Sequence, residues 1–213
     1  MISEWITTVA NFMQAGGPLM YIIATVWFCG LAIAFERFMK LNSKLDIDGP
    51  SFMNEIQRYV LSNDIEGAIR VCSGSEAALP RVLKSGLKRA NHPTEKIQNA
   101  LDATALEVVP KIEMRLPYMQ LIASVSTLFG LLGTVFALTK SFAAVGAADP
   151  STRSTLLAEG ISLAMNATAL GLLSAITLMI LHSFLVAKAD KIISEVDEYS
   201  VKLLDLLDTK DNK

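Results

Sequence analysis

The chain has 213 residues, of which 52% are hydrophobic and only 19% are charged, and its mean hydropathy is +0.41. This composition is unusual for a soluble domain and indicates a membrane protein. The formal charge is −2 and no basic, aromatic-interleaved patch is present, which argues against a nucleic-acid partner. The two cysteines and two separated histidines exclude a disulfide framework and a Cys/His metal site, so we expect no metal and no other cofactor.

The first segment, residues 1–17, places apolar side chains at helical spacing: Trp5, Ile6, Val9, Phe12 and Met13. This spacing predicts a short amphipathic helix on the outer surface of a membrane. The Gly-Gly-Pro sequence that ends at Pro18 interrupts this helix and opens an apolar segment, 18–41, long enough to span a bilayer. No basic residue precedes this segment and no small-residue cleavage site follows it, so we expect a membrane anchor rather than a secretory signal peptide.

Residues 42–117 are predicted to form a mostly helical cytoplasmic domain. Three short stretches with helical periodicity are separated by turn residues, and a longer helix follows, with Thr94 as its expected N-cap. An apolar run continues beyond this longer helix. We therefore expect Pro110 and Pro117 to bend it rather than stop it.

Two further predicted spans, 118–143 and 156–187, are joined by a loop at 144–155. Backbone polar groups in lipid must be satisfied within the segment, so both spans are expected to be helices. The third span is longer than a bilayer requires and should tilt or extend into water. Residues 188–213 continue it as an amphipathic helix, with apolar residues at 3–4 spacing: Ile192, Val196, Tyr199, Leu203 and Leu206. The predicted fold is an all-α membrane protein, with three transmembrane helices extended into a cytoplasmic helical bundle.

The basic residues predict the orientation. Of 19 Lys and Arg residues, only Lys140 and Arg153 lie near the 144–155 loop; the other 17 lie in 37–115 or from Lys188 onward. Basic loops stay in the cytoplasm. We therefore expect 42–117 and the C-terminus inside, with the N-terminus and the 144–155 loop outside.

The second and third spans lack a carboxylate near their middles but carry hydroxyl groups. Thr127, Thr134 and Ser141 recur every seven residues and lie on nearly one helix face. In the third span, Thr168 shares a face with small residues, which leaves room for a partner helix beside it. A hydroxyl can donate and accept a hydrogen bond, so it can pass a proton or solvate a carboxylate. The plainer alternative is that these hydroxyls bond only to carbonyls of their own helix.

Small residues at helical spacing favour close packing between membrane helices rather than ion binding. Such residues in the two spans are Gly130, Gly133, Gly160 and Gly171. Near the end of the first span, Glu36 and Arg37 leave two interpretations open: anchors at the membrane interface, or residues that position the cytoplasmic domain.

Three sequence segments together resemble the ExbB/TolQ/MotA family of ion-driven motor subunits. They are Gly16-Gly-Pro-Leu-Met20 with the later Glu36-Arg37, Phe129-Gly-Leu-Leu-Gly-Thr-Val-Phe136, and Gly160-Ile-Ser-Leu-Ala-Met-Asn-Ala-Thr-Ala-Leu-Gly-Leu172. The resemblance covers most of the chain and is strongest from residue 116 to about 187. The two glycine-containing motifs are specific in combination, whereas either alone is weak.

The resemblance implies a non-enzymatic, multi-pass subunit of the bacterial inner membrane, with a periplasmic N-terminus, a cytoplasmic C-terminus and lipids around it. Family members form homopentamers whose second and third spans line a pore. Single-span partners of the ExbD/TolR/MotB type sit in that pore and supply an ion-binding Asp. The resemblance favours Thr134 and Thr168 as ion-pathway residues, with Thr127 and Ser141 at the edges of the matched motifs.

The chain departs from the family pattern at three neighbouring positions. Leu163 replaces a Glu that ExbB and TolQ relatives usually carry, and Asn166 is polar where relatives are often apolar. Sodium-driven relatives tend to place a Thr where this chain has Ala167, so a proton is the expected ion and sodium the less favoured one. Flagellar-type subunits have a fourth span, and three predicted spans therefore favour an ExbB/TolQ-like topology.

Two alternatives belong to other classes of protein. One is a membrane scaffold that recruits cytoplasmic partners without ion flux. The other is a permease subunit, which would need mid-span charges or broken helices that this sequence lacks. The sequence does not name the driven process, and TonB-type uptake, Tol-type envelope maintenance and gliding or other motility all stay open.

Overall fold

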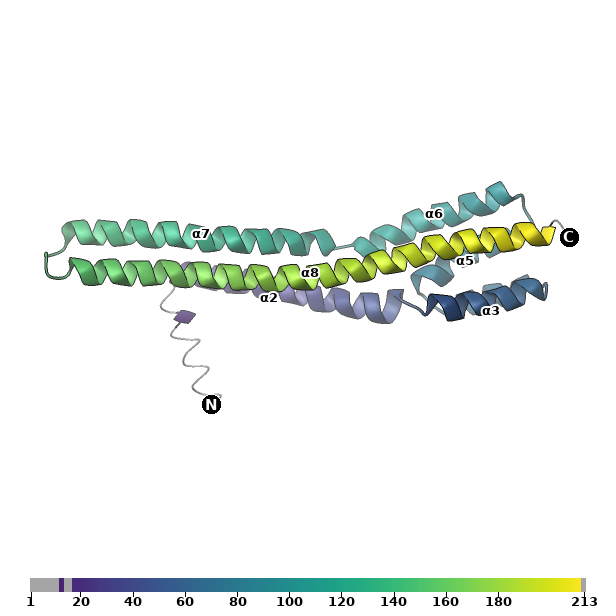
Figure 1. Cartoon of the computed structure of the whole chain (residues 1–213), viewed down its shortest axis with the longest axis horizontal. Coiled ribbons are helices and arrows are strands. Elements are labelled where there is room, and N and C mark those ends of the chain that lie inside the picture. Colours follow the sequence, from purple (N-terminus) through teal and green to yellow (C-terminus); the bar gives the residue numbers. More distant parts are fainter. Residues whose placement is uncertain (1–11, 14–16, 212–213) are drawn as a thin grey trace, which may run out of the picture. The chain divides into compact units, whose positions relative to one another are not determined.

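The computed structural model describes residues 12–13 and 17–211, and every regular element in these ranges is helical (Figure 1). Three helical stretches there are long and apolar enough to cross a membrane. The prediction of an all-α membrane protein is therefore confirmed. The predicted amphipathic segment at 1–17 lies outside the described residues, apart from Phe12, Met13 and Gly17.

The chain divides into two compact units. The membrane unit contains residues up to Phe35 and Pro117–Ser183, and the head unit contains Glu36–Leu116 and the chain from Phe184 onward. Helices α2 (Pro18–Lys40) and α8 (Arg153–Asp211) each contribute to both units without a break. The backbone crosses between the units a third time immediately after Leu116, at the start of α7 (Leu116–Ala147).

In the membrane unit, α7 and the first part of α8 form an antiparallel pair (Figure 1). The two helices extend beyond the expected spans, so the connection between them is only Ala148–Thr152. Helix α2 packs against this pair, with Gly30 pressed against Leu178 and Ile122. Large apolar side chains such as Phe28, Phe136 and Met165 are exposed, as expected for a surface that meets lipid or other membrane helices.

The head unit packs short helices into a core of aliphatic side chains. Helix α4 (Ile65–Ser73) packs against α3 (Gly49–Leu61) and α5 (Ala78–Leu87), and α5 packs against α6 (Thr94–Glu113). A π-helical turn, η1 (Leu41–Leu45), connects α2 to this bundle. Asp64 caps α4 by accepting a 2.7 Å hydrogen bond from the Gly67 amide.

The second part of α8 belongs to the same core. It buries one row of side chains at 3–4 spacing: Leu185, Ala189, Ile192, Val196, Tyr199, Leu203 and Leu207. Leu207, rather than the predicted Leu206, occupies the last buried position of this row. An ion pair between Lys188 and Asp46 joins α8 to the residues that follow η1.

Two predictions about α6 are wrong. Thr94 is the first helical residue and not the N-cap; Pro93 occupies the cap position, and the Thr94 hydroxyl donates to Asp208 Oδ1 at 3.0 Å. The helix also stops at Glu113 instead of bending into α7. Pro117 explains the stop, because proline cannot donate to the carbonyl four residues earlier and its ring clashes with that carbonyl. Pro110, by contrast, is accommodated inside α6.

Candidate functional site: the seam between α7 and α8

Helices α7 and α8 approach each other most closely where two glycines face one another. A Cβ atom on Gly171 would lie 2.8 Å from Gly130 Cα and 2.9 Å from the Ser126 carbonyl oxygen. These are backbone atoms that cannot rotate aside. One turn away, a Cβ on Gly133 would lie 2.7 Å from Ala167 Cβ. We call this contact the α7–α8 seam, and it is made by Ser126, Gly130, Gly133 and Ser141 of α7 with Leu156, Gly160, Ala167, Thr168 and Gly171 of α8.

Two of the predicted hydroxyl groups bridge the seam. Thr168 Oγ1 donates to the Gly130 carbonyl oxygen at 3.2 Å, and Ser141 Oγ donates to the Leu156 carbonyl oxygen at 3.0 Å. Ser141 is buried and also packs directly against Gly160. In both cases a side chain of one helix bonds to the backbone of the other, so these hydroxyls fix the helices relative to each other.

The other two predicted hydroxyls lie beside the seam. Thr134 Oγ1 donates to the Leu131 carbonyl at 2.6 Å, and Thr127 Oγ1 donates to the Ala123 carbonyl at 3.3 Å, both within α7. Thr134 is partly exposed and Thr127 is exposed. The structure therefore separates the four predicted ion-pathway residues into a bridging pair and an accessible pair. A hydroxyl that donates its hydrogen to a carbonyl keeps an oxygen that can accept one from another group.

Sequence reasoning missed two hydroxyls that the structure buries completely. Ser126 and Ser174 are both 0% exposed and donate to the carbonyls of Ile122 and Gly171 in their own helices. Their spacing from the packing glycines was the sequence signal that could have identified them. Ser126 stands four residues before Gly130 and Ser174 three residues after Gly171, on the same faces as the two glycines.

The seam carries hydroxyl groups and backbone carbonyls but no titrating side chain. Between Pro117 and Ser183, the acidic residues are Asp149 in the connection and Glu159 near the start of α8. Leu163 lines an apolar groove of about 450 Å³ with Gly133, Ala137 and Lys140 among its other walls. Among the described residues no cluster of His, Cys, Asp or Glu could hold a metal ion.

Asn166 and Ala167, the other two positions where this chain departs from the family pattern, follow Leu163 by three and four residues in α8. Ala167 is 1% exposed because it packs against Gly133 inside the seam. Asn166 is half-buried. Ala167 therefore has no space for a larger side chain unless α7 and α8 move apart.

The fold and the seam define an α-helical membrane protein in which two long helices pack on small residues and carry hydroxyls but no mid-span carboxylate. Residues 75–198, more than half of the chain, match the MotA/TolQ/ExbB proton channel family. The chain belongs to this family, as its motifs predicted.

Relatives in sequence and structure agree with this membership. The chain is 25% identical over 191 residues to an ExbB homolog of Methanothermobacter thermautotrophicus, covering 89% of this chain and 67% of that protein. It is 31% identical over 128 residues to the Tol-Pal system protein TolQ of Haemophilus influenzae, covering 56% of each. A chain in the structure of C. jejuni MotAB has a similar fold, with a TM-score of 0.65 at 16% identity over 97% of this chain and 86% of that one. The chain thus spans about half to two thirds of the length of these two sequence relatives.

Proposed function

We propose that this chain is the ring-forming subunit of a proton-driven motor in the bacterial inner membrane. In this proposal five copies surround a single-span partner of the ExbD/TolR/MotB type, and ion flow through the complex drives mechanical work. The observation that carries the proposal is the composition of the α7–α8 seam. It offers hydroxyls at mid-span and no carboxylate between Glu159 and Ser183. A proton-binding group must therefore come from another chain.

The proposed ion path uses the accessible hydroxyl of Thr134 and the bridging hydroxyl of Thr168. Both hydrogens are donated to carbonyls, so both oxygens can accept a hydrogen bond from a protonated aspartic acid on the partner. One charge crossing a potential of 100 mV gains about 2.3 kcal/mol. Because this gain is small, the path must lack deep wells, and neutral hydroxyls satisfy that requirement better than an additional fixed carboxylate.

The proposed orientation places the head unit in the cytoplasm and the Ala148–Thr152 connection in the periplasm. The distribution of basic residues supports it, because only Lys140 and Arg153 lie near that connection. The proposed membrane-spanning parts are 18–41, 118–143 and 156–187. In this arrangement the chain has no enzymatic chemistry of its own, and its output depends on the partner.

Native mass spectrometry in mild detergent tests the assembly. The chain is expressed alone and together with a single-span protein of the ExbD/TolR/MotB type. The proposal expects a pentamer in both cases, and partner copies bound to the pentamer in the second. A chain that remains monomeric or dimeric in both samples would contradict the ring. A stable ring that never retains the partner would instead favour a membrane scaffold without ion flux.

A further inference from the structure

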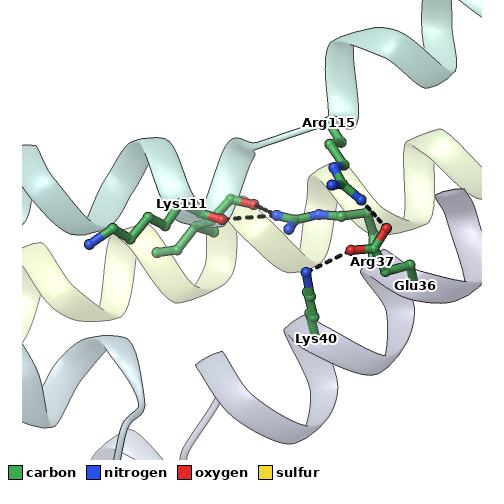
Figure 2. Close-up of polar contacts among 6 residues, drawn as sticks. Glu36, Arg37, Lys40, Lys111 and Arg115 are labelled. Atoms are coloured by element: carbon green, nitrogen blue, oxygen red, sulfur yellow. Dashed lines mark hydrogen bonds and ion pairs between the residues drawn. The ribbon is translucent and has the colours of Figure 1, made fainter.

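The break between α6 and α7 is held by two consecutive residues near the end of α2, as Figure 2 shows. The Arg37 side chain is buried, with the residue only 1% exposed. Its Nη2 atom donates to the carbonyl oxygen of Lys111 at 3.0 Å and also to that of Ile112. In a continuous helix these two carbonyls would accept from the amides of Arg115 and Leu116. The guanidinium therefore replaces donors that the break removes.

Glu36 holds the other side of the same break. Its carboxylate forms ion pairs with Arg115 and with Lys40, the latter at 2.6 Å (Figure 2). Arg115 has a φ of +68°, in the left-handed region that is unfavourable for residues other than glycine. The ion pair with Glu36 thus connects α2 to the residue of the break whose backbone has this unfavourable φ.

We propose that Glu36 and Arg37 are positioning residues that keep α6 and α7 as two separate helices. Pro117 prevents the helices from joining without strain, since it cannot donate to the Glu113 carbonyl. It does not by itself satisfy the carbonyls that the break exposes. An arginine suits this task because its planar fork presents several donors, and because cations are favoured at a helix C-terminus.

The break lies at the end of the head unit, immediately before the chain enters the membrane unit, so it can also affect where α7 begins. All of these contacts lie within the head unit, and the backbone enters the membrane unit directly after Leu116. Helix α7 carries Thr134 and one side of the seam. It begins directly after the α6–α7 break, which Glu36 and Arg37 of α2 contact; we call this break with its contacts the joint. We infer that the motor needs this joint, and this part of the inference rests on the proposed function.

Hydrogen exchange and thermal unfolding of the purified full chain test the joint. Arg37→Met should lower the apparent Tm by about 5 °C or more, because two carbonyls lose a charged donor. Adding Pro117→Ala should recover at least half of this loss. The helix can then continue, and the Arg115 and Leu116 amides should exchange about tenfold more slowly than in the wild type. If Arg37→Met does not fold, recovery of a folded chain in the double variant gives the same support.

Three results would overturn the positioning role. They are an Arg37→Met chain as stable as the wild type, a double variant no more stable than Arg37→Met, and a rescued double variant whose two amides stay unprotected. A charge exchange gives an independent check. Glu36→Arg and Arg115→Glu should each lower the Tm, and their combination should restore at least half of the loss; a combination as unstable as the worse single variant would contradict the role of Glu36.

Partner-dependent proton flux in the rescued double variant tests the functional part. We expect a folded protein whose flux falls by about tenfold or more, because α6 and α7 have become one helix. Wild-type flux in that variant would overturn the need for the joint. Absence of flux in the wild-type complex would contradict the proposed function instead, and the exchange and stability results would still decide the positioning role.

Discussion

Gly130 and Gly171 face each other across the α7–α8 seam so closely that a Cβ atom on Gly171 would lie 2.8 Å from Gly130 Cα. The same Cβ would lie 2.9 Å from the Ser126 carbonyl oxygen. This spacing lets the Thr168 hydroxyl of α8 reach the Gly130 carbonyl of α7. The seam therefore places hydroxyl groups and backbone carbonyls of two helices at a fixed separation, without bulky side chains between them.

Gly171→Ala should destabilise the membrane unit by about 1–3 kcal/mol, since the added methyl group meets backbone atoms and forces the helices apart. Thermal unfolding in detergent measures this loss. Gly146→Ala is the matched control in α7, because its Cβ would find nothing within 4 Å. The control should be neutral or slightly stabilising. Equal effects from the two substitutions would show that close packing at the seam is not what Gly171 provides.

Replacing Thr134 or Thr168 by Val keeps the shape of the side chain and removes the hydroxyl. Either change should lower partner-dependent proton flux by about tenfold, equivalent to about 1.4 kcal/mol at the limiting step, while the ring still assembles. Thr139→Val and Thr177→Val are controls for the loss of a hydroxyl within one helix, because these threonines, like Thr134, donate to carbonyls of their own helices. Wild-type flux in the Thr134→Val, Thr168→Val double variant would exclude both residues from the ion path.

A helix could be predicted from the sequence wherever a single periodic pattern of apolar residues determined it. The 3–4 spacing after Lys188 predicted a helix continuous with the third span, and α8 indeed runs unbroken from Arg153–Asp211. For the break after Glu113 the local signals conflict, because Pro117 favours a stop whereas the apolar run at 116 and beyond favours continuation. What stabilises the break is the Arg37 guanidinium, 74 residues away in sequence from its acceptor Lys111. Such a long-range contact leaves no local signal.

The candidate site shows the same division. The glycines of the two spans were identifiable as packing positions from their spacing, and the structure places Gly130, Gly133, Gly160 and Gly171 within the seam. The seven-residue repeat of Thr127, Thr134 and Ser141 suggested one continuous face. In the structure Ser141 is inside the seam and Thr127 is exposed. Helical spacing fixes relative angles along α7 but not which of those angles faces α8.

Cys72 should resist alkylation in the folded protein. Burial raises the pKa of its thiol from about 9 to about 12, so hardly any thiolate exists at pH 8. In a Cys29→Ser background, a maleimide should label Cys72 only when denaturant unfolds the head unit. Because the folded state retains this proton more tightly, the contribution of Cys72 to stability should be full below pH 9 and fall as the pH rises from about 9 to about 12. Rapid labelling without denaturant would contradict the burial of Cys72.

The transported ion is expected to be a proton. Sodium requires several oxygen ligands at once, and the residue before Thr168 is Ala167, which has no side-chain oxygen. Replacing sodium by potassium should leave the output unchanged, and a protonophore should abolish it. Ala167→Thr should lower stability rather than confer sodium dependence, because Ala167 is packed against Gly133. Output that rises with sodium and survives the protonophore would contradict this assignment.

The most direct measurement is proton flux into liposomes that contain the chain alone, the chain with its single-span partner, or the chain with a partner whose intramembrane Asp is replaced by Asn. The chain alone should give only background flux, because its seam has hydroxyls but no mid-span carboxylate. The intact complex should conduct protons, and the Asp→Asn complex should return to background. Flux through the chain alone as fast as through the complex, or an assembled complex with no flux, would contradict the account.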